Sequence, residues 1–279
     1  MQSLIERLNP EDESVRLGID VGGTKLLIVG YSRHDLRTWR FATGRELGPA
    51  EIIARVQEVR GEVGEGTAGM AIPGLVGADG TIADCDVLPK LSGWNPMADL
   101  GVGAVLNDGD AALSAVAFGE GPRSTVAAVG SGTAIAAAIQ VGGVRVRSVR
   151  PFACELGYVP FGRDGRMDDH AAGMFLLQRL GMQPAQIQAG LEHGEPRVLE
   201  AVREAGEAFG IALVTILHLM HPEKIGLYGG TLAYRGYLEA ALATVDRVGH
   251  PAMRPSCRIA VVEDPVTVVA AGALLEALR

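Results

Sequence analysis

The chain has 279 residues, 48% of them hydrophobic, which is enough to form one large domain or two lobes around a substantial core. Its 25 lysines and arginines are outnumbered by 33 aspartates and glutamates, giving a formal net charge of −8 without a cluster of basic residues. This composition argues against a protein that grips nucleic acid or anionic lipid by charge, so a bound phosphate must be held locally.

The first part of the chain is predicted to form an antiparallel meander, followed by alternating helices and strands. Strand-like apolar runs separated by short turns lie at 17–21, 26–31 and 38–43. Apolar residues then recur at helical spacing from Ile52 to Val59, and buried-strand candidates follow at 67–72 and 103–108, the second leading into an alanine-rich helix. Strands that alternate with helices indicate an α/β sheet.

Residues 125–148 repeat the opening layout, with three apolar strands separated by glycine-containing turns. The elements predicted after them are helices near 169–181 and 195–220, strands at 224–230 and 257–262, and a terminal helix from Pro265. The repeat predicts two α/β lobes of similar fold. We expect the first lobe to span 1–109, completed by the C-terminal helix at 264–279, and the second to span 110–263.

The cysteines and the N-terminal segment favour a reducing, cytoplasmic location. Cys85, Cys154 and Cys257 are far apart and odd in number, which fits neither a disulfide framework nor paired cysteines around a metal. Residues 1–16 contain no apolar run of signal-peptide length, and later apolar stretches are interrupted by glycine or polar residues. We therefore expect a cytoplasmic protein without a membrane anchor.

A glycine-containing turn joins the first two predicted strands in GIDVGGTKLLIVG, residues 18–30. It is no Walker A loop, because strand-forming residues rather than a helix follow Lys25. One interpretation is a plain glycine hairpin. The other is a phosphate turn, in which Asp20 holds magnesium while turn amides and the Thr24 hydroxyl meet phosphate oxygens. The turn GSGT at 130–133 allows the same two interpretations.

The polar run NDGD at 107–110 ends a predicted strand and begins a predicted helix, where α/β sheets present functional groups. Asparagine and aspartate are also common helix N-caps. We assign the cap to Asp110, because it immediately precedes the apolar helix AALSAVAF. This assignment leaves Asp108 to face a substrate.

The order of six motifs resembles the ROK family of sugar kinases, within the actin-like ATPase superfamily. They are GIDVGGTK (18–25), MAIPGLVG (70–77), VLNDGDAALSAVAFGEG (105–121), VGSGTA (129–134), ELGY (155–158) and IGLYGGTLA (225–233). The resemblance runs from about Leu17 to the C-terminus, and its specificity comes from motif order. It implies the two-lobed actin-like ATPase (ribonuclease H-like) fold with a cleft between the lobes and, by analogy, a homodimer.

The resemblance implies a phosphate donor, ATP with Mg2+, and the residues that hold it. The first phosphate motif matches Asp20, Gly22, Gly23, Thr24 and Lys25, and the second matches Gly130, Ser131, Gly132 and Thr133. Gly229 and Gly230 would lie against the adenosine. Asp20 would organise the magnesium ion.

The resemblance also implies the acceptor residues. Asp108 matches the catalytic base, which takes a proton from the attacking sugar hydroxyl. Positions that line the sugar pocket match Pro73, Gly74, Asn107 and Glu155. Asp168 could stand where the family usually has a second sugar-binding glutamate, and Tyr158 replaces a histidine that touches the sugar. The implied reaction is phosphorylation of a hexose on the carbon 6 hydroxyl, as in glucokinases.

The chain departs from the family at two places. Where family members bind structural zinc through that histidine and three cysteines, this chain has ELGYVPFGRDGRMDD, and no cysteine follows until Cys257. All four ligands are missing together, so no structural zinc is expected. Ala134 and Ala136 stand where the second phosphate motif often continues with glycine. Since some relatives use polyphosphate instead of ATP, either donor remains possible.

Three other side chains have ordinary structural explanations. His218 and His221 lie near the end of an apolar helix without an evident third ligand, which favours packing or capping over metal binding. Trp94 is either a wall of the sugar pocket or a core aromatic. These residues therefore add no independent site.

Other functions compete with an ATP-dependent hexose kinase. One is a polyphosphate-dependent or amino-sugar kinase, and another is a sugar-binding regulator without catalysis. Family regulators carry an N-terminal DNA-binding domain, whereas 16 residues before the first predicted strand are too few for a helix-turn-helix module. The presence of Asp108 also favours catalysis, so we expect a sugar as the partner and no nucleic acid.

Overall fold

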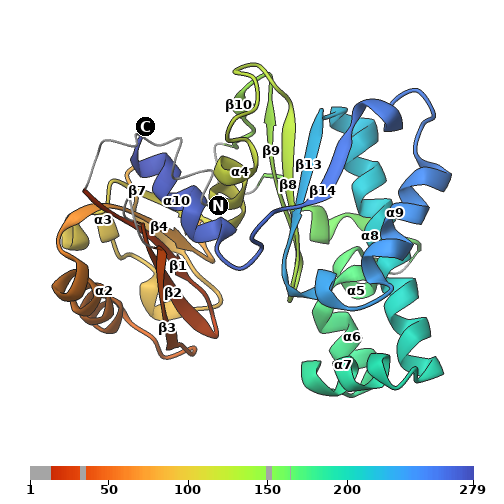
Figure 1. Ribbon diagram of the computed structural model, residues 1–279, viewed down its shortest axis with the longest axis horizontal. Helices are drawn as coiled ribbons and strands as arrows, with labels where there is room; N and C mark the ends of the chain where they lie inside the picture. Colours follow the sequence, from red (N-terminus) through yellow and green to blue (C-terminus); the bar gives the residue numbers. More distant parts are fainter. Residues whose placement is uncertain (1–13, 32–35, 149–152, 164) are drawn as a thin grey trace. The chain divides into compact units, whose positions relative to one another are not determined.

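The computed structural model describes residues 14–31, 36–148, 153–163 and 165–279. The chain divides into two compact units (Figure 1). Unit 1 takes in the residues up to Gly119, a short segment that begins at Arg147, and Val266–Arg279, while unit 2 takes in Glu120–Val146 and Ala153–Pro265. The chain therefore passes from unit 1 to unit 2 after Gly119 and, apart from the short segment that begins at Arg147, returns to unit 1 at Val266.

The sheet of unit 1 has the strand order β3-β2-β1-β4-β7. Its strands are β1 (Val15–Val21), β2 (Lys25–Tyr31), β3 (Leu36–Ala42), β4 (Gly66–Ile72) and β7 (Ala104–Asn107). The strand β2 pairs antiparallel with β1 and β3, whereas β4 pairs in parallel with β1 and β7. The predicted meander and the two later strands thus form one sheet with β1 at its centre.

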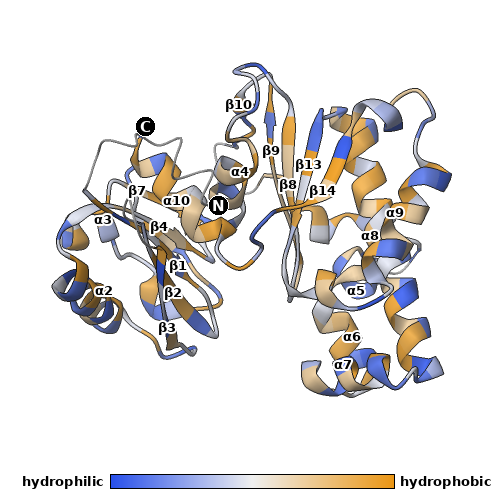
Figure 2. Cartoon of the chain, in the orientation of Figure 1, coloured by the Kyte–Doolittle hydropathy of each residue, from blue (hydrophilic) through white to orange (hydrophobic). Residues whose placement is uncertain are grey.

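Helices cover both faces of this sheet. They are α2 (Pro49–Val63), α3 (Pro96–Leu100), α4 (Asp108–Val116) and α10 (Val268–Ala277). Successive side chains of a strand point to opposite faces, so Leu26 packs in the core that contains α2 and Leu27 in the core that contains α10. The helix α10 is hydrophobic over most of its length (Figure 2), and the Ala270 carbonyl occupies the space that a side chain on Gly18 of β1 would need. Unit 1 therefore needs α10 to bury the centre of its sheet.

The sheet of unit 2 has the order β10-β9-β8-β13-β14. Its strands are β8 (Val126–Ser131), β9 (Ile135–Val141), β10 (Val144–Arg145), β13 (Lys224–Tyr228) and β14 (Arg258–Val261). Three antiparallel strands are followed by two strands that join in parallel, as in unit 1. The internal repeat in the sequence is therefore a repeat of sheet topology.

The helices of unit 2 pack around the long helix α8. They are α5 (Asp168–Ala171), α6 (Gly173–Leu180), α7 (Pro184–Glu192), α8 (Pro196–Met220) and α9 (Tyr237–Val248). Gly210 in α8 lies against the backbone carbonyl of Ala241 in α9, which leaves no room for a side chain there. The short elements are β5 (Leu75–Val76), β6 (Ile82–Asp84), β11 (Pro160–Phe161), β12 (Gly165–Arg166), η1 (Pro89–Leu91), η2 (Leu156–Tyr158), η3 (Gly230–Ala233) and η4 (Arg254–Ser256).

One predicted helix differs from the structure. The segment near 169–181 is divided into α5 and α6, because Ala172 between them has the extended conformation with φ −73° and ψ 157°. Gly173 begins α6, and its N–H donates to the Gly132 carbonyl at 2.7 Å instead of continuing α5. Within the described ranges no helix is both long and apolar enough to cross a membrane.

Candidate functional site

The first predicted phosphate turn is a tight β1–β2 hairpin in unit 1. Gly22 N–H donates to the Lys25 carbonyl at 2.8 Å, which closes the turn. Thr43 anchors it from beyond β3, because its hydroxyl donates to the Gly22 carbonyl at 2.6 Å and its N–H to the Thr24 carbonyl at 3.1 Å. Gly23 lies so close to the Val87 side chain that a methyl group would force Val87 to move. Hydrogen bonds from Thr43 and close packing against Val87 therefore hold the hairpin in place.

Strand register brings the predicted unit 1 residues to one edge of the sheet. Asp20 near the end of β1 pairs with Ala71 in β4, and Ile72 at the end of β4 pairs with Asn107 at the end of β7. Because these strands are parallel, their carboxyl ends meet at the same edge, where α/β sheets present functional groups. The predicted acceptor residues Pro73 and Asp108 directly follow β4 and β7, so they share this edge with Asp20.

The charge of Asp108 acts electrostatically on Asp20. Burial and the neighbouring charge of Asp108 raise the pKa of Asp20 to about 7, and Lys25 only partly opposes that shift. Burial also raises the pKa of Asp108, although hydrogen bonds from backbone amides, including that of Gly109, counteract it. Asp108 Oδ1 accepts the Gly109 N–H at 2.8 Å, which fixes the orientation of its carboxylate. Two carboxylates of raised pKa at one sheet edge can hold a cation and accept a proton.

The helix cap after β7 corrects one prediction. Asn107, not Asp110, is the N-cap of α4, since its Oδ1 accepts the Asp110 N–H at 2.6 Å and its backbone is extended. Asp110 is already inside the first turn, where its charge faces the positive end of the helix. The helix therefore starts three residues earlier than the assignment implied, and Asp108 is its first residue.

Cys85 contacts the turn that follows β4 and helps to hold it in place. The thiol of Cys85 donates to the Pro73 carbonyl at 3.3 Å, and Gly74 N–H donates to the Ile72 carbonyl at 2.9 Å. A side chain on Gly74 would lie 2.5 Å from the Asp84 carbonyl oxygen. Glycine is therefore required in this turn by close packing. None of the three described cysteines, Cys85, Cys154 and Cys257, takes part in a disulfide bond.

The second predicted phosphate turn connects β8 and β9 in unit 2, and two other segments, the start of α6 and the residues at η3, hold it. Gly132 N–H donates to the Ala134 carbonyl at 3.1 Å, which closes the turn as in the first hairpin. The Gly132 carbonyl accepts both the Gly173 N–H at the start of α6 and the Thr231 hydroxyl, the latter at 3.2 Å. Gly229, next to Gly230, has φ +106° and lies against the Ser131 carbonyl. The two predicted donor segments of unit 2 therefore touch each other.

A buried hydroxyl pair extends this anchoring. Ser131 Oγ lies 2.9 Å from the hydroxyl oxygen of Tyr237, which is fully buried in α9. The single Tyr237 hydroxyl hydrogen donates to the Ala171 carbonyl at 2.7 Å, so Ser131 is the donor within the pair. This chain of contacts ties the turn to α9 and α5.

The predicted acceptor residues of unit 2 surround η2. Glu155 is the residue before η2, and the Tyr158 side chain is 62% exposed with the Arg166 guanidinium 4.9 Å from its ring centre. Asp168 begins α5, and its Oδ1 accepts the Ile135 N–H at 2.7 Å. Burial raises the pKa of Asp168, and this hydrogen bond opposes the shift. Asp168 therefore contacts β9, the strand that follows the predicted phosphate turn.

The predicted site residues fall into two groups, one in each unit. Unit 1 holds Asp20, Gly22, Gly23, Thr24, Lys25, Pro73, Gly74, Asn107 and Asp108. Unit 2 holds Gly130, Ser131, Gly132, Thr133, Glu155, Tyr158, Asp168, Gly229 and Gly230. Among the residues that the structure describes, no three or more His, Cys, Asp or Glu side chains form a group that could hold a metal.

The remaining side chains of interest have structural contacts. Trp94 is buried in the unit 1 core and donates to Asp99 at 2.9 Å. His218 Nε2 accepts the His250 N–H at 3.0 Å, and His221 Nε2 lies 2.8 Å from the Ser256 hydroxyl. The two histidines therefore fasten the end of α8 to the segment after α9, as the packing interpretation predicts.

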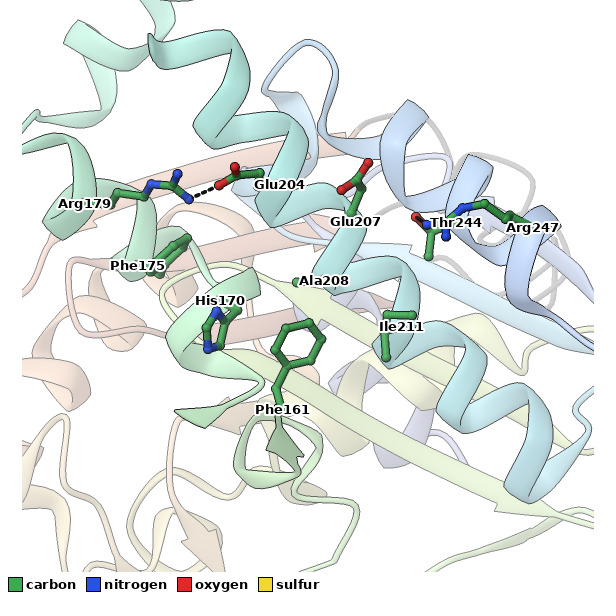
Figure 3. A pocket seen from close by; sticks show the side chains of 10 residues that line it. All are labelled: Phe161, His170, Phe175, Arg179, Glu204, Glu207, Ala208, Ile211, Thr244 and Arg247. Atoms are coloured by element: carbon green, nitrogen blue, oxygen red, sulfur yellow. Dashed lines mark hydrogen bonds and ion pairs between the residues drawn. The ribbon is translucent and has the colours of Figure 1, made fainter. Parts of the chain in front are cut away.

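A hollow of about 330 Å³ lies elsewhere in unit 2 (Figure 3). Its lining combines the rings of Phe161, His170 and Phe175 with charged side chains at α6, α8 and α9. None of the predicted site residues lines it. The pocket is therefore separate from both groups, although His170 belongs to the same short helix as Asp168.

The residues that anchor the turns are not among those predicted from the sequence. Thr43, Cys85, Thr231 and Tyr237 each bond a predicted site residue, but Tyr237 is 106 positions from its partner Ser131. Each looks like an ordinary strand, loop or helix residue within its own segment. Their contacts are recognised only in the folded structure, where strands and helices from distant parts of the sequence meet.

Comparison with known proteins identifies the fold. No protein-family model matches the chain. The sequence is 27% identical to kanosamine kinase of Amycolatopsis mediterranei (strain S699) over 245 residues, 78% of this chain and 80% of that protein. The structure of a ROK hexokinase from Thermus thermophilus superposes with a TM-score of 0.74 at 21% identity, covering 94% of this chain and 97% of the other.

A ROK family glucokinase from Streptomyces griseus, solved with glucose and AMPPNP, also has a TM-score of 0.74, at 19% identity over 93% of this chain and 97% of the other. These likenesses confirm the predicted resemblance to ROK family sugar kinases. They also show that the chain has their two-lobed actin-like ATPase fold.

Proposed function

We propose that this chain is a sugar kinase that transfers the γ-phosphate of ATP, bound with magnesium, to a hexose. The acceptor is the carbon 6 hydroxyl of glucose or a related sugar. One observation carries the proposal: Asp20 and Asp108 lie within electrostatic reach of each other at the carboxyl edge of the unit 1 sheet. A kinase needs a cation-binding group and a proton-accepting group close together.

Asp108 is the general base in this proposal. The proton of the acceptor hydroxyl passes to the Asp108 carboxylate while the acceptor oxygen bonds to the γ-phosphorus. The bond from that phosphorus to its bridging oxygen breaks, and ADP leaves. Burial raises the pKa of Asp108, which makes it a stronger base than an exposed aspartate, and the Gly109 amide orients it.

Asp20 and Lys25 serve the phosphate side. The carboxylate oxygens of Asp20 are hard ligands of the kind that magnesium prefers. Burial and the charge of Asp108 raise the pKa of Asp20 to about 7, and Lys25 offsets only part of this rise, so a divalent cation beside Asp20 would favour its ionised form. When bound, magnesium neutralises phosphate charge.

The other residues take the roles that the resemblance implies. Donor contacts come from Gly22, Gly23, Thr24, Gly130, Ser131, Gly132, Thr133, Gly229 and Gly230. Acceptor contacts come from Pro73, Gly74, Asn107, Glu155, Tyr158 and Asp168. The anchoring of both turns by distant hydrogen bonds supports a donor site, because phosphate binding by backbone amides requires a rigid loop.

An amino-sugar acceptor is the second candidate. The 27% identity to kanosamine kinase supports it, because that relative's name refers to an amino sugar. The same base and the same phosphate residues would serve either acceptor. The acceptor must therefore be found by assay.

The test is a phosphorylation assay on the purified chain with glucose, mannose, kanosamine and N-acetylmannosamine, each with ATP and with polyphosphate. We expect turnover of at least one sugar with ATP and magnesium, and a loss of at least about 10³-fold in kcat in Asp108→Asn, which keeps the shape but not the base. Asp246→Asn, at an aspartate that pairs with Arg254 in unit 2, is the matched control and should retain activity.

Binding of a sugar without turnover of any pair would contradict the kinase proposal and favour a sugar-binding regulator. Turnover with polyphosphate but not ATP would contradict the proposed donor. Activity that survives in Asp108→Asn would contradict the proposed base.

A further inference from the structure

The carboxylate of Asp168 occupies a position between two segments of unit 2. Its Oδ1 accepts the N–H of Ile135 at 2.7 Å. Ile135 is the first residue of β9 and pairs with Ser131 at the end of β8, so this N–H lies directly at the base of the phosphate turn. The hydrogen bond fixes the place where the chain leaves that turn.

The same carboxylate lies against the acceptor segment Glu155–Tyr158. A Cβ atom built on Gly157 would lie 2.5 Å from Asp168 Oδ1 and 2.5 Å from Oδ2, with no space for a methyl group. Gly157 is the buried middle residue of η2. The absence of a side chain at Gly157 therefore lets Asp168 contact both segments.

Neighbouring contacts prevent Asp168 from swinging away. The ring of His170, in the same helix, packs between two phenylalanine rings (Figure 3). Its centroid lies 4.8 Å from the centroid of the Phe161 ring and 5.9 Å from that of the Phe175 ring. The Ala171 carbonyl accepts the Tyr237 hydroxyl, and Met167 N–H donates to the Val159 carbonyl at 2.9 Å. Contacts on both sides of Asp168 along the chain therefore hold α5 in place.

We infer that Asp168 is a positioning residue that joins the acceptor segment to the phosphate turn, so that a change at Asp168 alters donor binding as well as acceptor binding. This inference deepens the proposed function and rests on it for the identity of the two ligands. A residue that served only as a sugar ligand would leave donor binding unchanged. The distinguishing observation is therefore the state of the phosphate turn when no sugar is present.

The experiment compares Asp168→Ala, Asp168→Asn and the neighbour control Asp169→Ala. Asparagine keeps an oxygen that can accept the Ile135 N–H, alanine removes it, and Asp169 instead accepts the Arg166 N–H at 2.9 Å on the exposed side of α5. Two readouts are taken without sugar: hydrogen–deuterium exchange of the peptide containing 130–136, and calorimetric affinity for Mg-ATP. KM for donor and acceptor completes the set.

We expect Asp168→Ala to speed exchange at Ile135 and to weaken Mg-ATP binding, each by about tenfold, equivalent to about 1.4 kcal/mol. Asp168→Asn should stay within about twofold of the parent protein in both measurements, and Asp169→Ala should match the parent. Gly157→Ala is a second probe, because its methyl group displaces the carboxylate from the opposite side and should also speed exchange at Ile135.

Unchanged exchange and unchanged Mg-ATP affinity in folded Asp168→Ala would overturn the inference, as would equal damage from the asparagine and alanine variants. If Asp168→Ala does not fold, unchanged exchange at Ile135 in Gly157→Ala overturns it instead. The exchange measurement needs no phosphoryl transfer. Failure of the proposed kinase activity and failure of this inference are therefore recorded separately.

Discussion

Tyr237 and Ser131 are 106 positions apart, yet their hydroxyl oxygens lie 2.9 Å apart inside unit 2. The Tyr237 hydroxyl also donates to the Ala171 carbonyl at 2.7 Å, so one buried oxygen serves the predicted phosphate turn and α5 together. Burial raises the pKa of Tyr237 well above its usual range, which keeps the phenol neutral and able to donate. The turn thus depends on a residue outside every motif.

Tyr237→Phe should therefore destabilise the protein. Removing the hydroxyl leaves the Ser131 hydroxyl and the Ala171 carbonyl without this buried partner, at a cost of about 1–3 kcal/mol in the free energy of unfolding. Urea unfolding measures the loss. Tyr234→Phe, at a half-buried position just before α9, is the matched control with a smaller expected effect. Equal stability of Tyr237→Phe and the parent would show that the hydroxyl bridge contributes nothing.

Glycine at the start of α6 is a second test of the turn. In Gly173→Ala the new methyl group would lie 2.6 Å from the Gly132 carbonyl oxygen and 2.8 Å from the Thr231 hydroxyl. We expect a loss of about 1–3 kcal/mol in stability, as for overpacked sites, and weaker Mg-ATP binding. Calorimetry and thermal unfolding check both. Normal nucleotide affinity in a folded Gly173→Ala would separate this contact from the donor site.

Gly61→Ala should have the opposite effect. Gly61 lies within α2, and a Cβ built there has nothing within 4 Å. Alanine replaces a poor helix former without a clash, so we expect a gain of about 0.5–1 kcal/mol in the free energy of unfolding. Urea denaturation measures it, and a loss of stability would contradict the open environment of this position.

Asp108→Asn should combine lost activity with increased stability. Burial raises the pKa of Asp108, so the folded protein holds this proton more tightly than the unfolded chain does, and the ionised carboxylate opposes folding at neutral pH. The amide removes that penalty. Thermal unfolding in EDTA should show Asp108→Asn more stable than the parent at pH 8. The difference in stability should shrink as the pH falls toward about 4, the pKa of an aspartate in the unfolded chain. A difference that grows at low pH would contradict this sign.

Glu120 should show the reverse pH dependence. Partial burial acts to raise its pKa, but hydrogen bonds and charge from Lys224 at 2.9 Å and Arg258 at 2.6 Å outweigh burial and lower it. Glu120→Gln should lower the free energy of unfolding by about 0.5–1 kcal/mol at pH 7. This loss should fade as the pH falls from about 4.3, the pKa of a glutamate in the unfolded chain, through the lower pKa of Glu120 in the folded protein. Urea unfolding from pH 7 to 3.5 tests it, with exposed Glu58→Gln as the control. A loss that persists at pH 3.5 would show that the charge is not responsible.

The strands and their turns were predictable because each depends on the residues of a short segment. Alternating apolar runs and glycine turns gave the two meanders, and parallel strands necessarily place Asp20 and Asp108 at one edge. The cap was not predictable in the same way. Asn107 and Asp110 are both good caps, and the choice depends on the extended backbone of Asn107 at the end of β7, with φ −72° and ψ 162°.

Contacts made across long stretches of sequence were also out of reach. The resemblance suggested that Asp168 touches a sugar, and that role stays a prediction, but its hydrogen bond to Ile135 depends on how α5 meets β9. The break between α5 and α6 has the same origin. Ala172 is a good helix former, and the helix is interrupted there because Gly173 bonds a turn 41 positions earlier.

The path of the chain through the two units sets an order for folding during synthesis. The residues of unit 2 all leave the ribosome before α10, so unit 2 can close its core first. Meanwhile Gly18 in β1 and Gly69 in β4 lack the carbonyls of Ala270 and Ala273 that pack against them in the folded protein. Until α10 emerges, the early strands expose an apolar face, and nascent unit 1 is the part of the chain that a chaperone would need to shield.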